Sequence, residues 1–314
     1  MFKFFGLRED PFRVSPDPRY LFLTPNIQKA LVSLAYGVQS RGGILLMTGE
    51  VGTGKTTLLQ KLLDWLHDNR AATAFLFNTR LSTSEFLHCM MADFGIPCQS
   101  HSKSDTVIRL NHWLLERIRQ GELTVLIVDE AQNLSTEVLE EIRLLANLET
   151  ATEKLLQIVL SGQPELDEKL KRPELRQLRQ RITFRCHTLP LTLHETEGYI
   201  AKRLSIAGAD GEPVFSPEAI QCVHEHSRGI PRVINILCQH ALINAIADQQ
   251  RPVPAHLVME AVDDLELISD EPAGLPAALE ESPNGGSAAG PRGQDSGARG
   301  ALVPVAVRSR EGRA

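Results

Sequence analysis

The sequence predicts an α/β fold in which a doubly wound parallel sheet is followed by a small all-helical domain and a disordered tail. Before about Leu189, short apolar runs alternate with helical patterns. Runs that are apolar on both faces and separated by helices are typical of a parallel sheet covered on each side. The predicted strands are Ile44–Thr48, Ala72–Asn78, Thr124–Val128 and Leu156–Ser161.

After about Leu189 the strand signals stop and only helical patterns follow. The helix that begins at Pro231 is apolar over a wide arc, which indicates packing against two neighbours and therefore a small bundle. From about Glu271 the chain has no aromatic residue and cannot bury enough apolar surface to order itself, so we expect a disordered tail. The predicted helices are His194–Ala207, Pro217–Ser227, Pro231–Ala247 and Ala255–Leu265.

Composition excludes several classes of protein. A net charge of −6 argues against coating nucleic acid with the whole surface, although a local basic face stays open. No stretch approaches the ~20 apolar residues of a membrane span, and the N-terminus has no apolar signal-peptide core. We expect a cytoplasmic protein and leave open a peripheral position at the inner membrane. The cysteines show no metal-site spacing and are predicted to be reduced core residues. They are Cys89, Cys98, Cys186, Cys222 and Cys238.

A phosphate-binding loop follows the first predicted strand. Its pattern, G-x-x-x-x-G-K-[ST], lies between a strand and a helix, which is the context that the motif requires. The glycines let backbone N–H groups turn toward phosphate, and the helix N-terminus adds partial positive charge. We expect Lys55 to reach the β- and γ-phosphates of ATP, Thr56 to bind Mg²⁺, and Thr57 to add a phosphate contact. The loop reads Gly49-Glu50-Val51-Gly52-Thr53-Gly54-Lys55-Thr56.

An acidic pair ends the third predicted strand. Asp129 is expected to hold Mg²⁺ and Glu130 to polarise the attacking water. Ser161 and Gln163, after the fourth strand, are expected near the γ-phosphate or the water. For Asn78, after the second strand, we keep two interpretations: a residue that restrains Glu130 until a partner binds, or a plain transition from strand to loop.

Two sets of arginines are candidates for stabilising the charge of phosphoryl transfer. Arg176, Arg179 and Arg181 precede the helical domain, and Arg181 is the first choice for a finger that reaches a neighbouring protomer. A solvated basic helix face is the alternative. Arg232 lies in the first turn of a helix, where a cation opposes the helix dipole, so we expect a nucleotide phosphate nearby.

These residues resemble one known family. The chain is similar to the AAA+ ATPases of the general secretion pathway A-component group, which includes ATPases associated with exosortase systems, and it also resembles transposition-helper ATPases. The resemblance covers about residues 1–265. It is carried by Phe5-Gly6-Leu7, Asp10-Pro11-Phe12, Ser15-Pro16-Asp17-Pro18, the phosphate loop, Val128-Asp129-Glu130-Ala131-Gln132-Asn133-Leu134, Ser161-Gly162-Gln163-Pro164-Glu165-Leu166, Leu178-Arg179-Gln180-Arg181 and Gly229-Ile230-Pro231-Arg232.

The resemblance implies ATP hydrolysis at an interface between protomers, hence a homo-oligomer, with the Phe5–Tyr20 segment near the adenine. It implies the roles given above for Lys55, Thr56, Asp129, Glu130 and Arg232. Together with Arg181, chosen from its position, the expected catalytic residues are Lys55, Glu130, Arg181 and Arg232. The implied organisation is an N-terminal segment near the nucleotide (1–42), an AAA+ P-loop domain (43–188), a helical lid (189–268) and a disordered tail (269–314). Secretion members often continue into a membrane span, whereas the tail here is polar, so we expect no direct span.

Three functions compete. The first is an ATPase that drives assembly or remodelling of a partner complex in envelope secretion or export. The second is a DNA-linked ATPase of the transposition-helper type, for which Lys169–Arg185 offers a basic stripe but which the acidic net charge does not favour. The third is a nucleotide-dependent scaffold without hydrolysis, and Glu130 argues against it.

Overall fold

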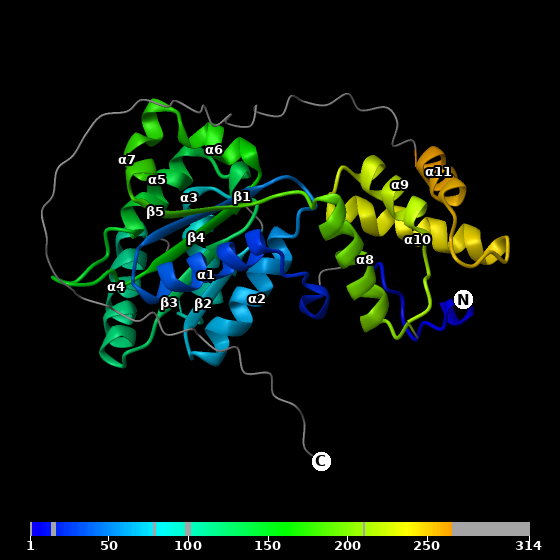
Figure 1. The fold of residues 1–314 in the computed structure, drawn as a ribbon. Helices are drawn as coiled ribbons and strands as arrows, with labels where there is room; N and C mark the ends of the chain where they lie inside the picture. Colours follow the sequence, from blue (N-terminus) through cyan, green and yellow to red (C-terminus); the bar gives the residue numbers. More distant parts are fainter. Residues whose placement is uncertain (1, 14–16, 78–79, 98–101, 210, 266–314) are drawn as a thin grey trace, which may run out of the picture. The chain divides into compact units, whose positions relative to one another are not determined.

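Five strands form a single parallel sheet, which confirms the predicted fold class (Figure 1). The structure is a computed structural model that describes residues 2–13, 17–77, 80–97, 102–209 and 211–265. The order β2-β3-β4-β1-β5 brings the phosphate-loop strand β1 between β4 and β5. The strands are β1 (Ile44–Gly49), β2 (Ala72–Leu76), β3 (Thr124–Val128), β4 (Gln157–Gly162) and β5 (Ile182–Thr188).

The edge strand β5 was not predicted from the sequence. Exposed residues alternate along it with half-buried or buried ones, and the exposed residues include Arg185 and His187. An edge strand pairs on one side only, so it does not need the continuous apolar run that identifies β1 or β3. The fold therefore contains one strand more than the four expected, and this strand leads directly into the helical domain.

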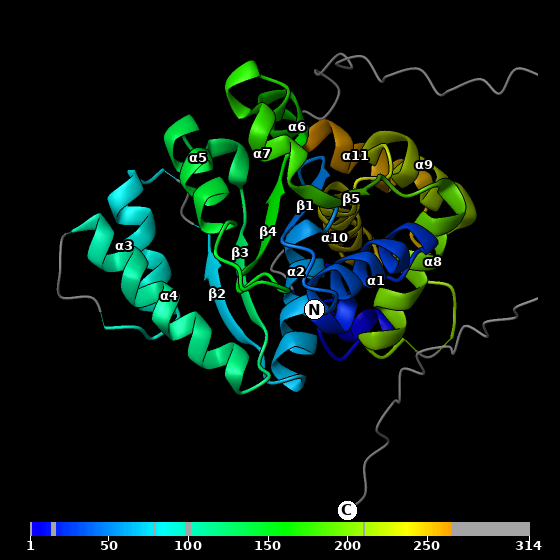
Figure 2. The ribbon, with the colours of Figure 1, turned by 90° about the vertical axis from the view of Figure 1, so that its left-hand side faces the viewer.

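Helices cover both faces of the sheet, as Figure 2 shows with α3, α4 and α5 on one side and α1 and α2 on the other. On one face, Leu46 and Leu126 pack with α3, α4, α5, α6 and α7 in the larger core. On the other, Leu45 and Ile127 pack against α1 and α2. The helices of this part are α1 (Pro25–Gln39), α2 (Lys55–Asp68), α3 (Thr83–Asp93), α4 (Lys103–Arg119), α5 (Thr136–Leu145), α6 (Pro164–Leu170) and α7 (Arg176–Gln180). Short 3-10 helices lie at Phe2–Phe5, Pro18–Tyr20, Ala131–Asn133 and Pro173–Leu175.

The predicted helical domain is present and has its own core. Three aromatic or aliphatic residues of the N-terminal segment, Phe5, Leu7 and Phe12, are buried in that core together with residues of all four helices. The first part of the N-terminal segment is therefore part of the helical domain, whereas α1, which lies in the same segment, packs on the sheet. The four helices are α8 (Leu193–Ile206), α9 (Pro217–Ser227), α10 (Pro231–Ala247) and α11 (Ala255–Asp264).

The cysteines correct one expectation. Cys89 is exposed on α3, so it is not a core residue. Cys186, Cys222 and Cys238 are buried, and burial raises the pKa of the Cys186 thiol to about 12. Cys98, Asn78 and the tail lie outside the described residues. Within the described ranges, no helix combines the length and apolarity that crossing a membrane requires.

Candidate functional site

The loop between β1 and α2 has the backbone of an anion-binding site. Gly52 and Gly54 have φ values of +81° and +95°, a left-handed conformation that glycine adopts without steric cost. Gly54 caps α2 and offers no side-chain hydrogen bond to it. The first N–H groups of α2 therefore have no intrahelical partner, and the positive end of the helix dipole faces the loop.

The Lys55 side chain is buried inside this loop. Its Nζ donates to the carbonyl oxygens of Gly49 at 2.7 Å and Glu50 at 3.0 Å. Burial lowers the pKa of Lys55, while the nearby carboxylates of Glu130 and Asp129 act in the opposite direction. A triphosphate would offer this ammonium charged acceptors in place of neutral carbonyls, and charge-assisted hydrogen bonds are the stronger kind.

Asp129 lies at the centre of a second group of contacts. Thr56 Oγ1 donates to Asp129 Oδ2 at 3.0 Å. Ser161 Oγ donates to Asp129 Oδ1 at 2.8 Å, and the backbone N–H of Glu130 donates to the same oxygen at 3.0 Å. Ser161 is fully buried behind Asp129 and does not line the cavity described below. Its hydroxyl therefore orients the Asp129 carboxylate, which differs from the expected contact with nucleotide.

Glu130 is held by two side-chain amides. Gln132 Nε2 and Gln163 Nε2 donate to Glu130 Oε2 at 2.5 Å and 3.2 Å. Glu130 itself has φ +53°, an uncommon conformation for a residue with a side chain, which is often found at functional sites. Gln132 was not singled out as a site residue from the sequence. Its only local signal is its position two residues after Glu130.

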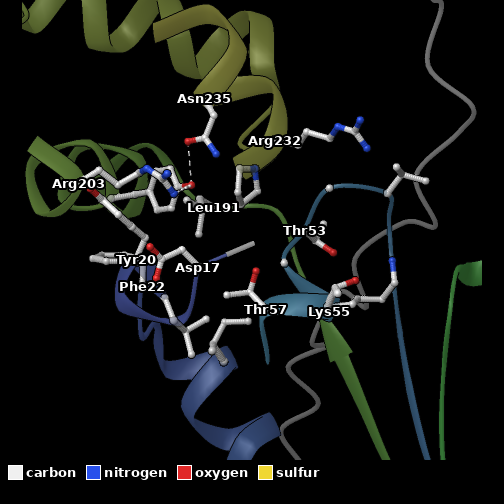
Figure 3. A pocket seen from close by; sticks show the side chains of 18 of the residues that line it. Asp17, Tyr20, Phe22, Thr53, Lys55, Thr57, Leu191, Arg203, Arg232 and Asn235 are labelled. Atoms are coloured by element: carbon white, nitrogen blue, oxygen red, sulfur yellow. Dashed lines mark hydrogen bonds between the residues drawn. The ribbon is translucent and has the colours of Figure 1, made fainter. Parts of the chain in front are cut away.

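A cavity of about 410 Å³ joins the loop to the helical domain. Figure 3 shows Thr53, Lys55 and Thr57 at one end, and Tyr20, Phe22, Arg203 and Asn235 at the other. Glu130 also lines it, so the water-polarising candidate and the phosphate loop share one space. The phosphate end is lined by Val51, Gly52, Thr53, Gly54, Lys55, Thr56 and Thr57. Gly49 and Glu50 contribute their carbonyl groups to Lys55 instead of lining the cavity.

The helical domain touches the loop through Arg232. Its backbone N–H donates to the Gly52 carbonyl at 3.2 Å, and its side chain lines the cavity. In the described part of the chain, no carboxylate forms an ion pair with Arg232. The expected contact of Arg232 with a nucleotide phosphate stays a prediction.

Strand β5 braces the same loop from the other side. Thr188 Oγ1 and Thr53 Oγ1 are 2.7 Å apart and share a hydrogen bond. Three residues later, Leu191 lines the cavity, and its N–H donates to the Gly229 carbonyl at 2.8 Å. Gly229 permits this close approach because a Cβ at that position would lie 2.0 Å from the Leu191 oxygen.

The candidate finger arginines lie away from this cavity. Arg181 follows α7 and precedes β5, whose first residue Ile182 pairs with Ile44 at the start of β1. The phosphate loop follows the opposite end of β1. The structure therefore brings Lys55, Thr56, Asp129, Glu130 and Arg232 together but leaves Arg181 at the opposite end of the strands. Arg176 and Arg179 are exposed.

Two sequence comparisons agree with this geometry. Residues 38–170 match the family model described as an AAA domain. Over 270 residues, the chain is 43% identical to the general secretion pathway protein A of Aeromonas hydrophila. That match covers 86% of this chain and 49% of the relative, so the chain spans about half the length of the relative.

Solved structures share the fold at low sequence identity. The ORC2 protein of Aeropyrum pernix, solved as ADPNP–ADP complexes, is 17% identical with a TM-score of 0.62, over 85% of this chain and 76% of that chain. Cdc6p of Pyrobaculum aerophilum is 16% identical with a TM-score of 0.63, over 82% of this chain and 71% of that chain. The RuvB Holliday junction branch migration motor of Thermotoga maritima is 17% identical with a TM-score of 0.52, over 78% of this chain and 70% of that chain. At such identities the likeness concerns the fold alone.

Proposed function

We propose that the chain is an ATPase of the AAA type, which binds ATP with Mg²⁺ and hydrolyses it to ADP and phosphate through Lys55, Thr56, Asp129 and Glu130. The observation that carries the proposal is the shared cavity: Glu130 and Lys55 line one space, and Thr56 contacts Asp129 beside it. Binding alone would need only the loop. An acid beside the phosphate end supports hydrolysis as well.

Mg²⁺ fits the residues at this place. Thr56 Oγ1 and Asp129 Oδ2 are hard oxygen donors 3.0 Å apart at the phosphate end. Over the described ranges, no group of three or more His, Cys, Asp or Glu is arranged to hold a metal. This suits an ion that arrives with the nucleotide, because Mg²⁺ usually keeps waters and phosphate oxygens as ligands. When bound, it would neutralise phosphate charge.

The remaining residues bind and orient. The ammonium of Lys55 and the guanidinium of Arg232 stabilise negative charge on the phosphates, and Thr57 adds a hydroxyl. The backbone N–H groups of the cavity-lining part of the loop, Val51–Thr57, surround the phosphate chain. Glu130 accepts a proton from the attacking water, with its carboxylate held in place by Gln132 and Gln163.

The place of Arg181 favours a homo-oligomer. At the amino end of β5, opposite the strand ends that lead into the phosphate loop, it cannot serve its own nucleotide and is available to a neighbour's site. Mixing inactive Arg181→Ala and Lys55→Ala proteins should then restore part of the hydrolysis, because a mixed interface can combine an intact loop with an intact arginine. No recovery on mixing would contradict a finger supplied by a neighbour.

The cellular role we propose is assembly or remodelling of a protein complex for secretion or export through the envelope. The 43% identity to general secretion pathway protein A supports it. It also supports a cytoplasmic position beside the inner membrane. A Glu130→Gln protein loaded with ATP should retain its partner during purification, whereas the same protein carrying Lys55→Ala should not. Retention of DNA in place of a protein would favour the transposition-helper alternative.

Steady-state hydrolysis with a matched control tests the enzymatic core. Glu130→Gln should lower kcat by roughly 10²–10⁴-fold while ATP still binds, because the amide cannot take up a proton. Glu165→Gln is the control: this carboxylate lies on α6, near enough to influence the Lys55 pKa but not lining the cavity, and should leave kcat nearly unchanged. Undiminished hydrolysis by Lys55→Ala would overturn the proposal.

A further inference from the structure

A buried arginine in α8 is directed at the far end of the cavity. Arg203 is 6% exposed. Its Nε donates to the carbonyl oxygen of Pro11 at 2.5 Å, and its Nη2 donates to the carbonyl oxygen of Arg13 at 3.2 Å. Its Cζ lies 4.4 Å from the centre of the Tyr20 ring. These contacts, all with the N-terminal segment, leave Nη1 to donate to the Tyr199 hydroxyl at 2.9 Å.

This contact fixes the direction of the next hydrogen bond. A guanidinium can only donate, so the Tyr199 oxygen accepts from Arg203 and its single proton must be given elsewhere. Asn235 Oδ1 receives it at 2.9 Å. Burial raises the pKa of Tyr199, which keeps the phenol protonated for this role. The amide oxygen of Asn235 is therefore occupied, and the amide orientation is set by the chain of donors.

The nitrogen of that amide is left to the cavity. Figure 3 shows the Asn235 nitrogen on the branch away from the dashed hydrogen bond. Asn235 is 6% exposed and lines the cavity, and among the described residues its Nδ2 has no hydrogen-bond acceptor. This nitrogen is open to the cavity, so a ligand held there can supply its acceptor. The same cavity is lined by Tyr20, Phe22 and Leu191, flat or apolar groups that suit an aromatic base.

We propose that Asn235, oriented by Arg203 through Tyr199, selects adenine over guanine by donating to a ring nitrogen on the edge of the base. The inference rests on the proposed function, because it assumes that the phosphates occupy the loop. Adenine presents an unprotonated ring nitrogen at the position where guanine carries N–H. Two donors would then face each other when guanine enters, and both would stay unpaired. Asn235 is the specificity residue, and Tyr199 and Arg203 are positioning residues.

Affinities for ATP and GTP, measured by calorimetry on the full chain with Mg²⁺, test the proposal. Wild type should prefer ATP by roughly tenfold or more. Asn235→Asp has the same shape but presents an acceptor where the nitrogen was. This variant should bind ATP roughly tenfold more weakly, and its preference for ATP over GTP should shrink. Asn244→Asp, on the same helix but not lining the cavity, should change neither value.

Tyr199→Phe provides the second variant, because it keeps the ring in the core and removes the hydroxyl that accepts from Arg203 and donates to Asn235. The Asn235 amide can then turn over, so the preference for ATP should shrink while the affinity for inorganic triphosphate stays as in wild type. Equal wild-type affinities for ATP and GTP, or an unchanged ratio in Asn235→Asp, would overturn the inference and leave hydrolysis standing. Failure of wild type to bind either triphosphate would overturn both proposals.

Discussion

Gln132 donates its side-chain amide to Glu130 Oε2 over 2.5 Å, and the backbone N–H of Gln163 fixes the other end of that amide by donating to Gln132 Oε1 at 3.1 Å. A backbone N–H can only donate, so the amide oxygen must face Gln163 and the amide nitrogen must face Glu130. The position of the Glu130 carboxylate is thus set by residues from two separate loops, after β3 and after β4.

Loss of this contact should slow hydrolysis without weakening nucleotide binding. We expect Gln132→Ala to lower kcat by about tenfold, a fraction of the full effect of a general base, because the carboxylate loses a defined position. ATP affinity should stay unchanged, since Gln132 does not line the cavity. Asn133→Ala, in the same short helix, is the control and should behave as wild type. Equal losses in the two variants would mean that only the helix had been disturbed.

The buried ammonium of Lys55 makes the free energy of unfolding depend on pH in the alkaline range. Burial lowers the pKa of Lys55 below the 10.5 of an ordinary lysine. The cost of burying the charge is fully present below the lowered pKa and is relieved as pH rises through it, since the folded chain then releases a proton that the unfolded chain keeps. Urea unfolding without nucleotide should therefore show wild type gaining stability relative to Lys55→Met as pH rises toward 10.5. If the unfolding free energies of wild type and Lys55→Met changed in parallel with pH, this prediction would be wrong.

Two glycines of the loop allow a matched comparison. Both have positive φ, so alanine at either should cost about 1–2 kcal/mol of unfolding free energy. A Cβ on Gly54 would meet nothing within 4 Å, whereas a Cβ on Gly52 would lie 2.7 Å from Arg232 Cβ and 3.1 Å from Ile230 Cγ2. Gly52→Ala should therefore lose a further ~1–3 kcal/mol in urea unfolding, because it forces α10 away from the loop. Equal losses would show that this contact contributes nothing.

The basic stripe of Lys169–Arg185 should not bind DNA strongly. Several of its cations already have local partners: Lys169 donates to the Gln132 and Leu134 carbonyls, Lys171 pairs with Glu168 at 2.6 Å, and Arg185 with Asp167 at 3.1 Å. DNA affinity measured between 50 and 200 mM salt should be weak and should change little, because few phosphate contacts form. A fall of about 10³-fold or more over that range would restore the DNA-linked alternative.

The parts of the site that depend on adjacent residues could be predicted from the sequence. β1 and β3 are apolar on both faces, so each strand and the loop or acidic pair after it stand out in the chain. Lys55, Thr56 and Asp129 follow from those local patterns. The strand β5 could not be found in this way, because one of its edges is open and its pattern alternates.

Residues brought together by the fold could not be assigned. Ser161 is 32 positions from Asp129 and bonds it only because β4 and β3 are neighbours. The relay from Arg203 to Asn235 depends on three side-chain orientations and on an N-terminal segment about 190 positions away. The sequence shows which residues can donate or accept, whereas their direction is set by packing.

The short peptide between Thr188 and Leu191 connects the phosphate loop to the helical domain. One end shares a hydrogen bond with the phosphate loop, and the other forms the cavity wall and holds the turn at Gly229. Three residues span at most about 10 Å even when fully extended, so this tether has almost no slack. A shift of the loop that keeps the Thr53–Thr188 hydrogen bond would therefore be passed on to Leu191 and, through it, to the turn at Gly229 in the helical domain.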